Sequence, residues 1–463
     1  MNEKRGLLFP IALCLPLLTP LVVFPSVLYP YVFSKAIFFQ VTVALAAFLW
    51  AWEVYRARSL NIPFHTIDEV IILWVVVNWL AGAFGQDFSL SFWSTAERMD
   101  GLLMLSSGVL FFFLLRQAFR TELEWRRAWM SFVGVGGMIA LIALLQVAGL
   151  LPRGTQFENR LASTMGNPAF LGSYLLFPIF GALWMGWDSR PGSVRVSFWI
   201  IALLGVSALV LTGNRGSLLG LAVGLTVSLA VGWKGIESRS RIYGLLAMVV
   251  IAAALTLGGW WAHRRPGLAE RQPLLSRLLE NPMESQTVKS RLYSWQVGVR
   301  AWRVHPWLGW GPENYTVATQ SYYDPGASRL LDPQFFDKPH NKLIETMVAS
   351  GVAGLSVLTL FFLLGLAFCL RPTLPYSVRA LFTGLWCAYA VNEMAFFDTP
   401  STVMSLSFVL AFMAAHATAF ASMKRSISFG SVLKRDSSLS REVESQTRND
   451  GARSSRRHLS HLR

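Results

Sequence analysis

Two arginines and one histidine stand where polar turns meet apolar stretches of the chain: Arg215, Arg291 and His340. Arg215 follows the short polar turn 212–217 (TGNRGS), and its guanidinium is costly to place at a membrane surface unless it meets an anion. The helix N-terminus expected there adds backbone N–H donors and the positive end of the helix dipole. The turn therefore predicts an anion site; the alternative is an arginine that extends to lipid headgroups.

His340 lies in the segment 337–341 (DKPHN), directly before an apolar stretch. A neutral imidazole can accept a proton from a hydroxyl at about pH 7, so His340 is a candidate general base. A histidine at a helix start is also a common capping residue, so this interpretation depends on its neighbours. Arg291 beside Arg215 would complete a two-arginine clamp for a diphosphate, although a cation on an amphipathic helix is usually solvated or interfacial.

The segment 159–168 (NRLASTMGNP) holds two further candidates, Arg160 and Asn167. Asn167 before a proline is also a signal for a helix start. The sequence contains no P-loop, no dinucleotide-binding glycine pattern, no paired Cys or His ligands and no outward-facing DxD pair. It therefore predicts no cofactor and no metal site.

The composition places these residues in a membrane protein. Hydrophobic residues make up 53% of the 463 residues and charged residues only 14%, with a mean hydropathy of +0.44. A soluble enzyme of this length would carry more charge on its surface. The net charge of +15 could suggest nucleic acid, but the Lys and Arg lie in short loops between apolar segments, so we expect no nucleic-acid partner. The predicted fold class is an all-α polytopic membrane helical bundle.

Stretches long enough to cross a bilayer predict about 12 transmembrane helices. They lie near 7–29, 33–55, 68–86, 101–119, 128–151, 168–187, 196–212, 215–233, 243–262, 342–370, 377–397 and 401–422. Lys and Arg concentrate in the even-numbered loops, which places those loops and both termini in the cytoplasm.

The predicted organisation has four parts. Helices one to nine occupy 1–262, and a large outward-facing loop occupies 263–341. Helices ten to twelve occupy 342–422, and 423–463 is a disordered basic cytoplasmic tail that could contact anionic membrane lipids.

Short amphipathic helices are predicted within the large loop. One covers 288–304, with Leu292, Trp295, Val299 and Trp302 on one face, and ends before Pro306. A second short helix is predicted over 268–279.

Taken in order, these segments resemble the O-antigen ligase and O-antigen polymerase superfamily of bacterial envelope enzymes. The resemblance spans residues 95–397 and depends on a combination of motifs. These are NRLASTMGNP (159–168), TGNRGS (212–217), Ser-Arg (290–291) leading to Trp302, HPWLGWGPENY (305–315), PHN with a glutamate at 345, and GxxG (351–354).

The resemblance implies a twelve-helix inner-membrane bundle with a periplasmic loop folded over a cavity at the outer leaflet. It also implies metal-independent, inverting transfer of a glycan from undecaprenyl diphosphate to an acceptor hydroxyl. Arg215 and Arg291 would hold the diphosphate, and His340 would take the acceptor's proton. Arg160 and Asn167 would line the donor side.

Several functions fit this resemblance. A ligase transfers the glycan to lipid A–core, a polymerase to another lipid-linked repeat, and a protein O-oligosaccharyltransferase to a protein. The single large loop favours the ligase, because polymerases more often have two comparable loops. A secondary transporter is a distant alternative, since the halves of the chain look unrelated and the polar residues gather at the outer surface.

Overall fold

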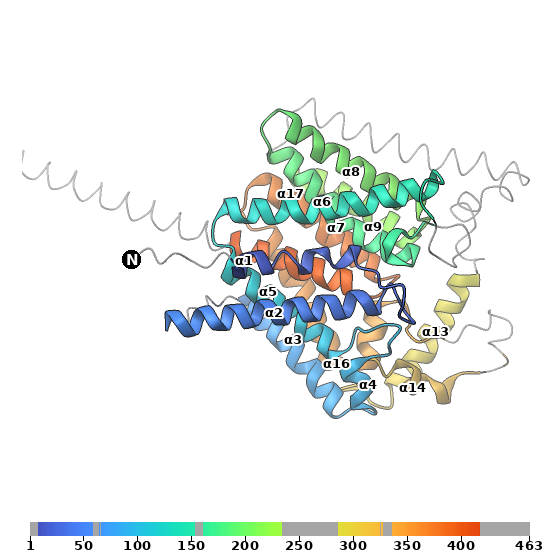
Figure 1. Cartoon of the computed structure of the whole chain (residues 1–463). Helices are drawn as coiled ribbons and strands as arrows, with labels where there is room; N and C mark the ends of the chain where they lie inside the picture. Colours follow the sequence, from blue (N-terminus) through green and yellow to red (C-terminus); the bar gives the residue numbers. More distant parts are fainter. Residues whose placement is uncertain are drawn as a thin grey trace, which may run out of the picture. The chain divides into compact units, whose positions relative to one another are not determined.

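The computed structural model describes residues 8–58, 64, 66–152, 161–233, 286–324, 326 and 336–416 (Figure 1). The chain divides into two units, Met1–Ala414 and Ala415–Arg463, and the description below concerns the first. Within the described ranges the secondary structure is helical, without a strand. The predicted span 243–262, the helix predicted over 268–279, the tail 423–463 and the candidate Arg160 lie outside the described residues.

Helices coincide with all the predicted spans that fall within the described residues. In chain order they are α1 (Leu8–Ala12), η1 (Pro16–Leu21), α2 (Phe33–Ala57), α3 (Thr66–Ala83), α4 (Phe88–Trp93), α5 (Leu102–Ala118), α6 (Glu122–Val147), η2 (Ser163–Met165), α7 (Pro168–Asp188), α8 (Ser193–Leu211), α9 (Arg215–Gly232), α13 (Gln286–Trp302), α14 (Tyr315–Thr319), η3 (Gln320–Tyr322), α16 (Lys342–Cys369) and α17 (Tyr376–Glu393). A last helix covers Pro400–His416. The proline-rich first span is broken into α1 and η1, because proline interrupts the helical hydrogen bonds.

Within the part of the chain that the structure describes, seven helices are long and apolar enough to cross a membrane: α2, α3, α6, α7, α8, α9 and α16. Three shorter apolar helices accompany them, over Leu8–Leu21, Leu102–Ala118 and Pro400–His416. The prediction of a multi-pass helical membrane protein is therefore confirmed. The predicted total of about 12 spans and the outward position of the large loop stay predictions.

Small residues let α17 and α9 pack closely against each other. A Cβ added at Gly220 would stand 2.6 Å from the carbonyl oxygen of Ala388, and one at Gly224 would stand 2.6 Å from that of Gly384. Glycine allows two membrane helices to approach at backbone distance. Helix α7 packs against both α9 and α17. Of its most apolar 18-residue stretch, 89% is buried.

Helix α16 is interrupted at Gly351, which has φ +63°. The N–H groups of Trp310 and Gly311 donate to the carbonyls of Val348 and Ala349 at 2.8 and 2.9 Å, just before the interruption. After it, the N–H groups of residues 352 and 353 donate to the carbonyls of residues 306 and 307 at 2.8 and 3.1 Å. The turn 306–311 therefore supplies partners for backbone groups that an interrupted helix leaves unpaired.

Helix α13 agrees in extent with the predicted amphipathic helix, but its buried face differs from the expected apolar face. The buried residues are Ser290, Ser294, Val297, Gly298 and Ala301, whereas Leu292 is 40% exposed. Small side chains face inward because α13 packs closely on α16 and α14, where Gly298 approaches Ile344.

Candidate active site

Three helices begin with an asparagine cap at the same end of the bundle. The Asn167 side chain accepts from the N–H of Ala169 in α7 at 2.8 Å, and the Asn214 side chain accepts from the N–H of Gly216 in α9 at 3.2 Å. The Asn341 side chain accepts from the N–H groups of residues 343 and 344, both in the first turn of α16, at 3.0 and 3.1 Å. Asparagine is among the best N-cap residues because its oxygen satisfies N–H groups that have no partner within the helix.

The C-terminal end of α17 joins these three helix starts. Ser217 of α9 donates to Asn392 at 2.8 Å, and Asn392 donates to Ser173 of α7 at 2.9 Å. Asn341 donates from its amide to the carbonyl of Met394 at 3.0 Å. The N-termini of α7, α9 and α16 therefore meet around residues 392–397. Each contributes the positive end of a helix dipole, so this end of the bundle favours an anion.

Both candidate arginines are near this meeting point. Arg215 is the first residue of α9 and is half-buried; a Cβ on the following Gly216 would lie 3.1 Å from Ala395. Arg291 is a half-buried residue of α13, close enough for its charge to lower the pKa of His340. Asn167 belongs to the same region through α7, whereas Arg160 is not described.

His340 lies against an aromatic wall. Its ring centroid is 5.1 Å from that of Phe397 and 5.9 Å from that of Phe336. Nδ1 is 3.0 Å from the carbonyl oxygen of Lys338, and because a carbonyl can only accept, Nδ1 carries the proton and Nε2 holds the free lone pair. Burial, and then the charge of Arg291, lower the pKa of His340 to about 4. The imidazole is therefore neutral at neutral pH, as a general base requires.

Residues 336–341, named here the His340 segment, are anchored at successive positions. Asp337 pairs with Arg98 from the turn before α5. The carbonyl of Pro339 accepts from Nε1 of Trp295, one helical turn after Arg291 in α13, at 2.8 Å. His340 itself has φ +53°, a conformation that non-glycine residues adopt at a cost. The anchors on both sides hold the segment in this conformation.

Lys338 is the most deeply buried anchor, with a side chain only 5% exposed. Its ammonium donates to Asp100, to Glu313 at 2.8 Å and to Glu345 at 3.0 Å. All three N–H donors of the ammonium therefore have a carboxyl-group oxygen as partner. Burial and the neighbouring Asp100 raise the pKa of Glu313 to about 8, whereas the Lys338 ammonium holds that of Asp100 below its ordinary value. Glu313 is thus the member that keeps a proton at neutral pH.

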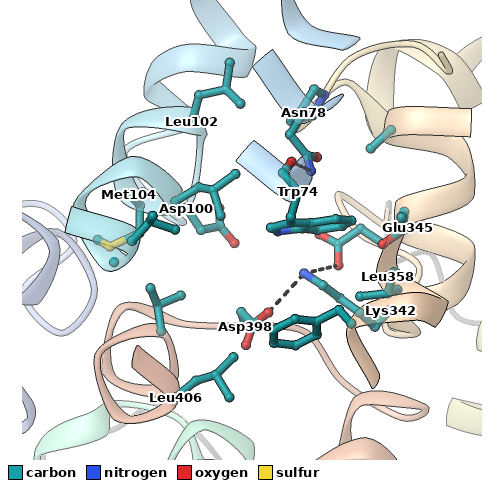
Figure 2. Close-up of a pocket in the computed structure, with 18 of the residues that line it drawn as sticks. Trp74, Asn78, Asp100, Leu102, Met104, Lys342, Glu345, Leu358, Asp398 and Leu406 are labelled. Atoms are coloured by element: carbon teal, nitrogen blue, oxygen red, sulfur yellow. Dashed lines mark hydrogen bonds and ion pairs between the residues drawn. The ribbon is translucent and has the colours of Figure 1, made fainter. Parts of the chain in front are cut away.

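Asp100, Glu313 and Glu345 also line a cavity of about 160 Å³. Figure 2 shows Asp100, Lys342, Glu345 and Asp398 around it, with Trp74 of α3 on one side. The Lys342 ammonium lies 3.0 Å from Asp398 and 3.6 Å from Glu345. Most of the remaining wall is apolar, including Leu102, Met104, Leu358 and Leu406. A buried ammonium in such a wall is tolerated because carboxylates compensate its charge.

Reasoning from sequence missed the anchoring residues Lys338, Asp100 and Glu313. A signal was available for two of them, because charged residues are scarce in this chain and Lys338 and Asp100 lie beside apolar segments. Their partnership could not be read from spacing, since Lys338 and Asp100 are 238 positions apart.

A comparison with family models identifies the O-antigen ligase family over residues 200–359. No curated protein matches the chain. The matched region includes Arg215, Arg291 and His340, the turn 306–311 and the glycine that interrupts α16; Asn167 and Arg160 precede it. Residues 200–359 therefore match the O-antigen ligase family, in agreement with the family that the sequence resemblance predicted.

Proposed function

We propose that the chain transfers a glycan from undecaprenyl diphosphate to an acceptor hydroxyl on the periplasmic side of the bacterial inner membrane. The family supports glycosyl transfer of the O-antigen ligase and polymerase type. The observation that carries the proposal is the meeting of three asparagine-capped helix starts with Arg215, Arg291 and a neutral His340 at one end of the bundle.

The diphosphate would bind where these positive groups meet. Guanidinium groups match phosphate geometry and make charge-assisted hydrogen bonds, and the N-termini of α7 and α9 add backbone donors. Asn167 and Arg160 would contribute on the donor side. The same groups would stabilise the negative charge that grows on the diphosphate as it leaves, which is the largest contribution in many transfers of this kind.

His340 would act as the general base. Nε2 takes the proton of the acceptor hydroxyl while the hydroxyl oxygen forms a bond to the anomeric carbon. The bond from that carbon to the diphosphate oxygen breaks, and its electron pair leaves with the lipid diphosphate. Attack from the side opposite the leaving group inverts the anomeric centre.

Ligation to lipid A–core is the favoured reaction, because the candidate residues gather around one large loop, with polymerase and protein O-oligosaccharyltransferase activity as alternatives. The glycan phenotype of a deletion strain separates them. Unattached long chains on the lipid carrier indicate a ligase, and single repeats on lipid A–core indicate a polymerase. An unchanged envelope glycan and unchanged protein glycosylation contradict the proposal.

Complementation of that strain tests the residues. We expect His340→Ala to lower transfer by about 100- to 10,000-fold, the usual contribution of a general base. Arg215→Ala and Arg291→Ala are each expected to lower it by about 100-fold or more. Arg300→Ala is the matched control, because Arg300 is an exposed cation on the same helix as Arg291. Normal transfer by His340→Ala, with the variant protein present in the membrane, would remove His340 as the base.

A further inference from the structure

The His340 segment is connected to the charged cavity wall through one residue, Lys338. Its backbone carbonyl accepts the Nδ1 proton of His340 at 3.0 Å. Its ammonium uses all three donors on Asp100, Glu313 and Glu345. Lys338 thus has two roles. Its carbonyl makes the hydrogen bond that sets the tautomer of His340, and its ammonium makes the contacts that hold the backbone carrying this carbonyl in place.

The three carboxyl groups come from separate parts of the fold. Asp100 precedes α5, Glu313 precedes α14 and Glu345 is in the first turn of α16. The hydroxyl oxygen of Ser94 also lies within hydrogen-bond distance of two of them, 3.0 Å from Oδ1 of Asp100 and 2.8 Å from Oε2 of Glu313. A side chain held from three directions cannot change rotamer without leaving buried carboxylates unpaired, which is costly. Asp100, Glu313 and Glu345 therefore together determine the position of the Lys338 backbone.

We propose that Lys338 is a positioning residue for His340: its ammonium, held by Asp100, Glu313 and Glu345, fixes the carbonyl that accepts the Nδ1 proton and so leaves Nε2 as the basic atom. This inference rests on the proposed function for its catalytic meaning, but the geometry is independent of it. Lys338 does not touch the reacting atoms in this proposal. Lys338 acts indirectly, because it keeps the proton of His340 on Nδ1 and keeps the imidazole buried.

The ionisation of His340 provides the readout. The charged groups around His340 are Arg291 on α13, Arg98 before α5, and Asp337 on its own segment. While the segment is anchored, burial and Arg291 lower the pKa of the imidazole to about 4. If Lys338 no longer holds the segment, the ring gains water and its pKa moves toward the ordinary value of about 6.5.

Diethyl pyrocarbonate reacts with neutral imidazole, so its rate of reaction at His340 reports this ionisation without any substrate. The full-length protein is treated in detergent between about pH 8 and about pH 5, and the peptide containing His340 is quantified by mass spectrometry. With a pKa of about 4 the rate stays within about 10% across this range, whereas with a pKa of about 6.5 it falls about 30-fold.

Lys338→Met alone leaves buried carboxylates without their cation and could prevent folding. The test therefore uses the double variant Lys338→Met/Asp100→Asn, which removes one charge of each sign. The matched control is Lys342→Met/Asp398→Asn, an ammonium–carboxylate pair of the same cavity, separated by 3.0 Å, that is outside the His340 segment. Lys338→Arg, which retains the cation, is the conservative variant.

We expect the 30-fold fall in reactivity for Lys338→Met/Asp100→Asn, and a flat profile for wild type, for the control and for Lys338→Arg. With donor extracted from membranes of the deletion strain, kcat should fall while KM for the donor stays unchanged, because the arginines remain. A flat profile in the folded Lys338 double variant overturns the proposal. A shifted profile in a protein whose wild type transfers no glycan retains the positioning role and rejects the proposed function.

Discussion

Replacing Gly351 by alanine tests whether the interruption of α16 holds the site together. A Cβ at Gly351 would stand 2.3 Å from the carbonyl oxygen of Trp307, 2.4 Å from its carbonyl carbon and 2.7 Å from the amide nitrogen of Leu308. These are backbone atoms, which cannot rotate away as a side chain could. The φ of +63° is also unfavourable for alanine.

The free-energy cost follows from these contacts. The backbone conformation at φ +63° and ψ −157°, which is almost exclusive to glycine, costs alanine about 1 kcal/mol. To make room for the Cβ, the turn 306–311 must move away from α16. This movement breaks the hydrogen bonds from the N–H groups of residues 352 and 353 to the carbonyls of residues 306 and 307, each of which contributes about 1 kcal/mol. The sum is about 3 kcal/mol, which for a chain of 463 residues corresponds to a melting temperature lower by roughly 3 °C.

Thermal unfolding of the purified full-length protein in detergent measures this change. Gly134→Ala in α6 is the matched control, because a Cβ there would meet nothing within 4 Å. It should melt at or slightly above the wild-type temperature, since alanine favours helix by about 1 kcal/mol. Transfer by Gly351→Ala should also fall, because the same turn leads directly to Glu313. If Gly351→Ala has the same melting temperature as the wild type, the interruption of α16 does not have the stabilising role assigned to it.

Two further outcomes concern the reaction itself. In the proposed mechanism the neutral form of His340 is the active one. This form is present above the folded pKa of about 4 and is lost only as pH falls through that value. We therefore expect kcat/KM to lose only about 10% through His340 between about pH 8 and about pH 5. A steep loss centred near the ordinary histidine pKa would contradict this. Transfer should also survive EDTA, because guanidinium groups and helix N-termini supply the positive charge in the proposed mechanism; a loss that only added divalent metal restores would show otherwise.

Much of the helical framework could be predicted from the sequence because its signals are local. Apolar length located the spans, and Asn167 before a proline marked the start of α7. The prolines of the first span, visible in the sequence, break it into α1 and η1. Such features depend on a residue and its near neighbours, so one sequence is enough to read them.

Motif resemblance selected Arg215, Arg291 and His340, and composition selected a membrane bundle. Neither could say that the helix starts at Asn167, Asn214 and Asn341 meet around the end of α17. The buried face of α13 was also misjudged, because hydrophobic periodicity does not report how closely a neighbouring helix approaches, and close approach selects Ser290, Ser294 and Gly298.

Tertiary structure alone decided which charges meet. Lys338 and Asp100 are 238 positions apart, and Ser217 and Asn392 are 175 apart. Such pairs are formed only when helices distant in the chain pack together, and the low polarity around them makes each missing partner costly. The sequence by itself determined that scarce charges border the apolar spans. The packing determined that Lys338 fixes the segment carrying the candidate base.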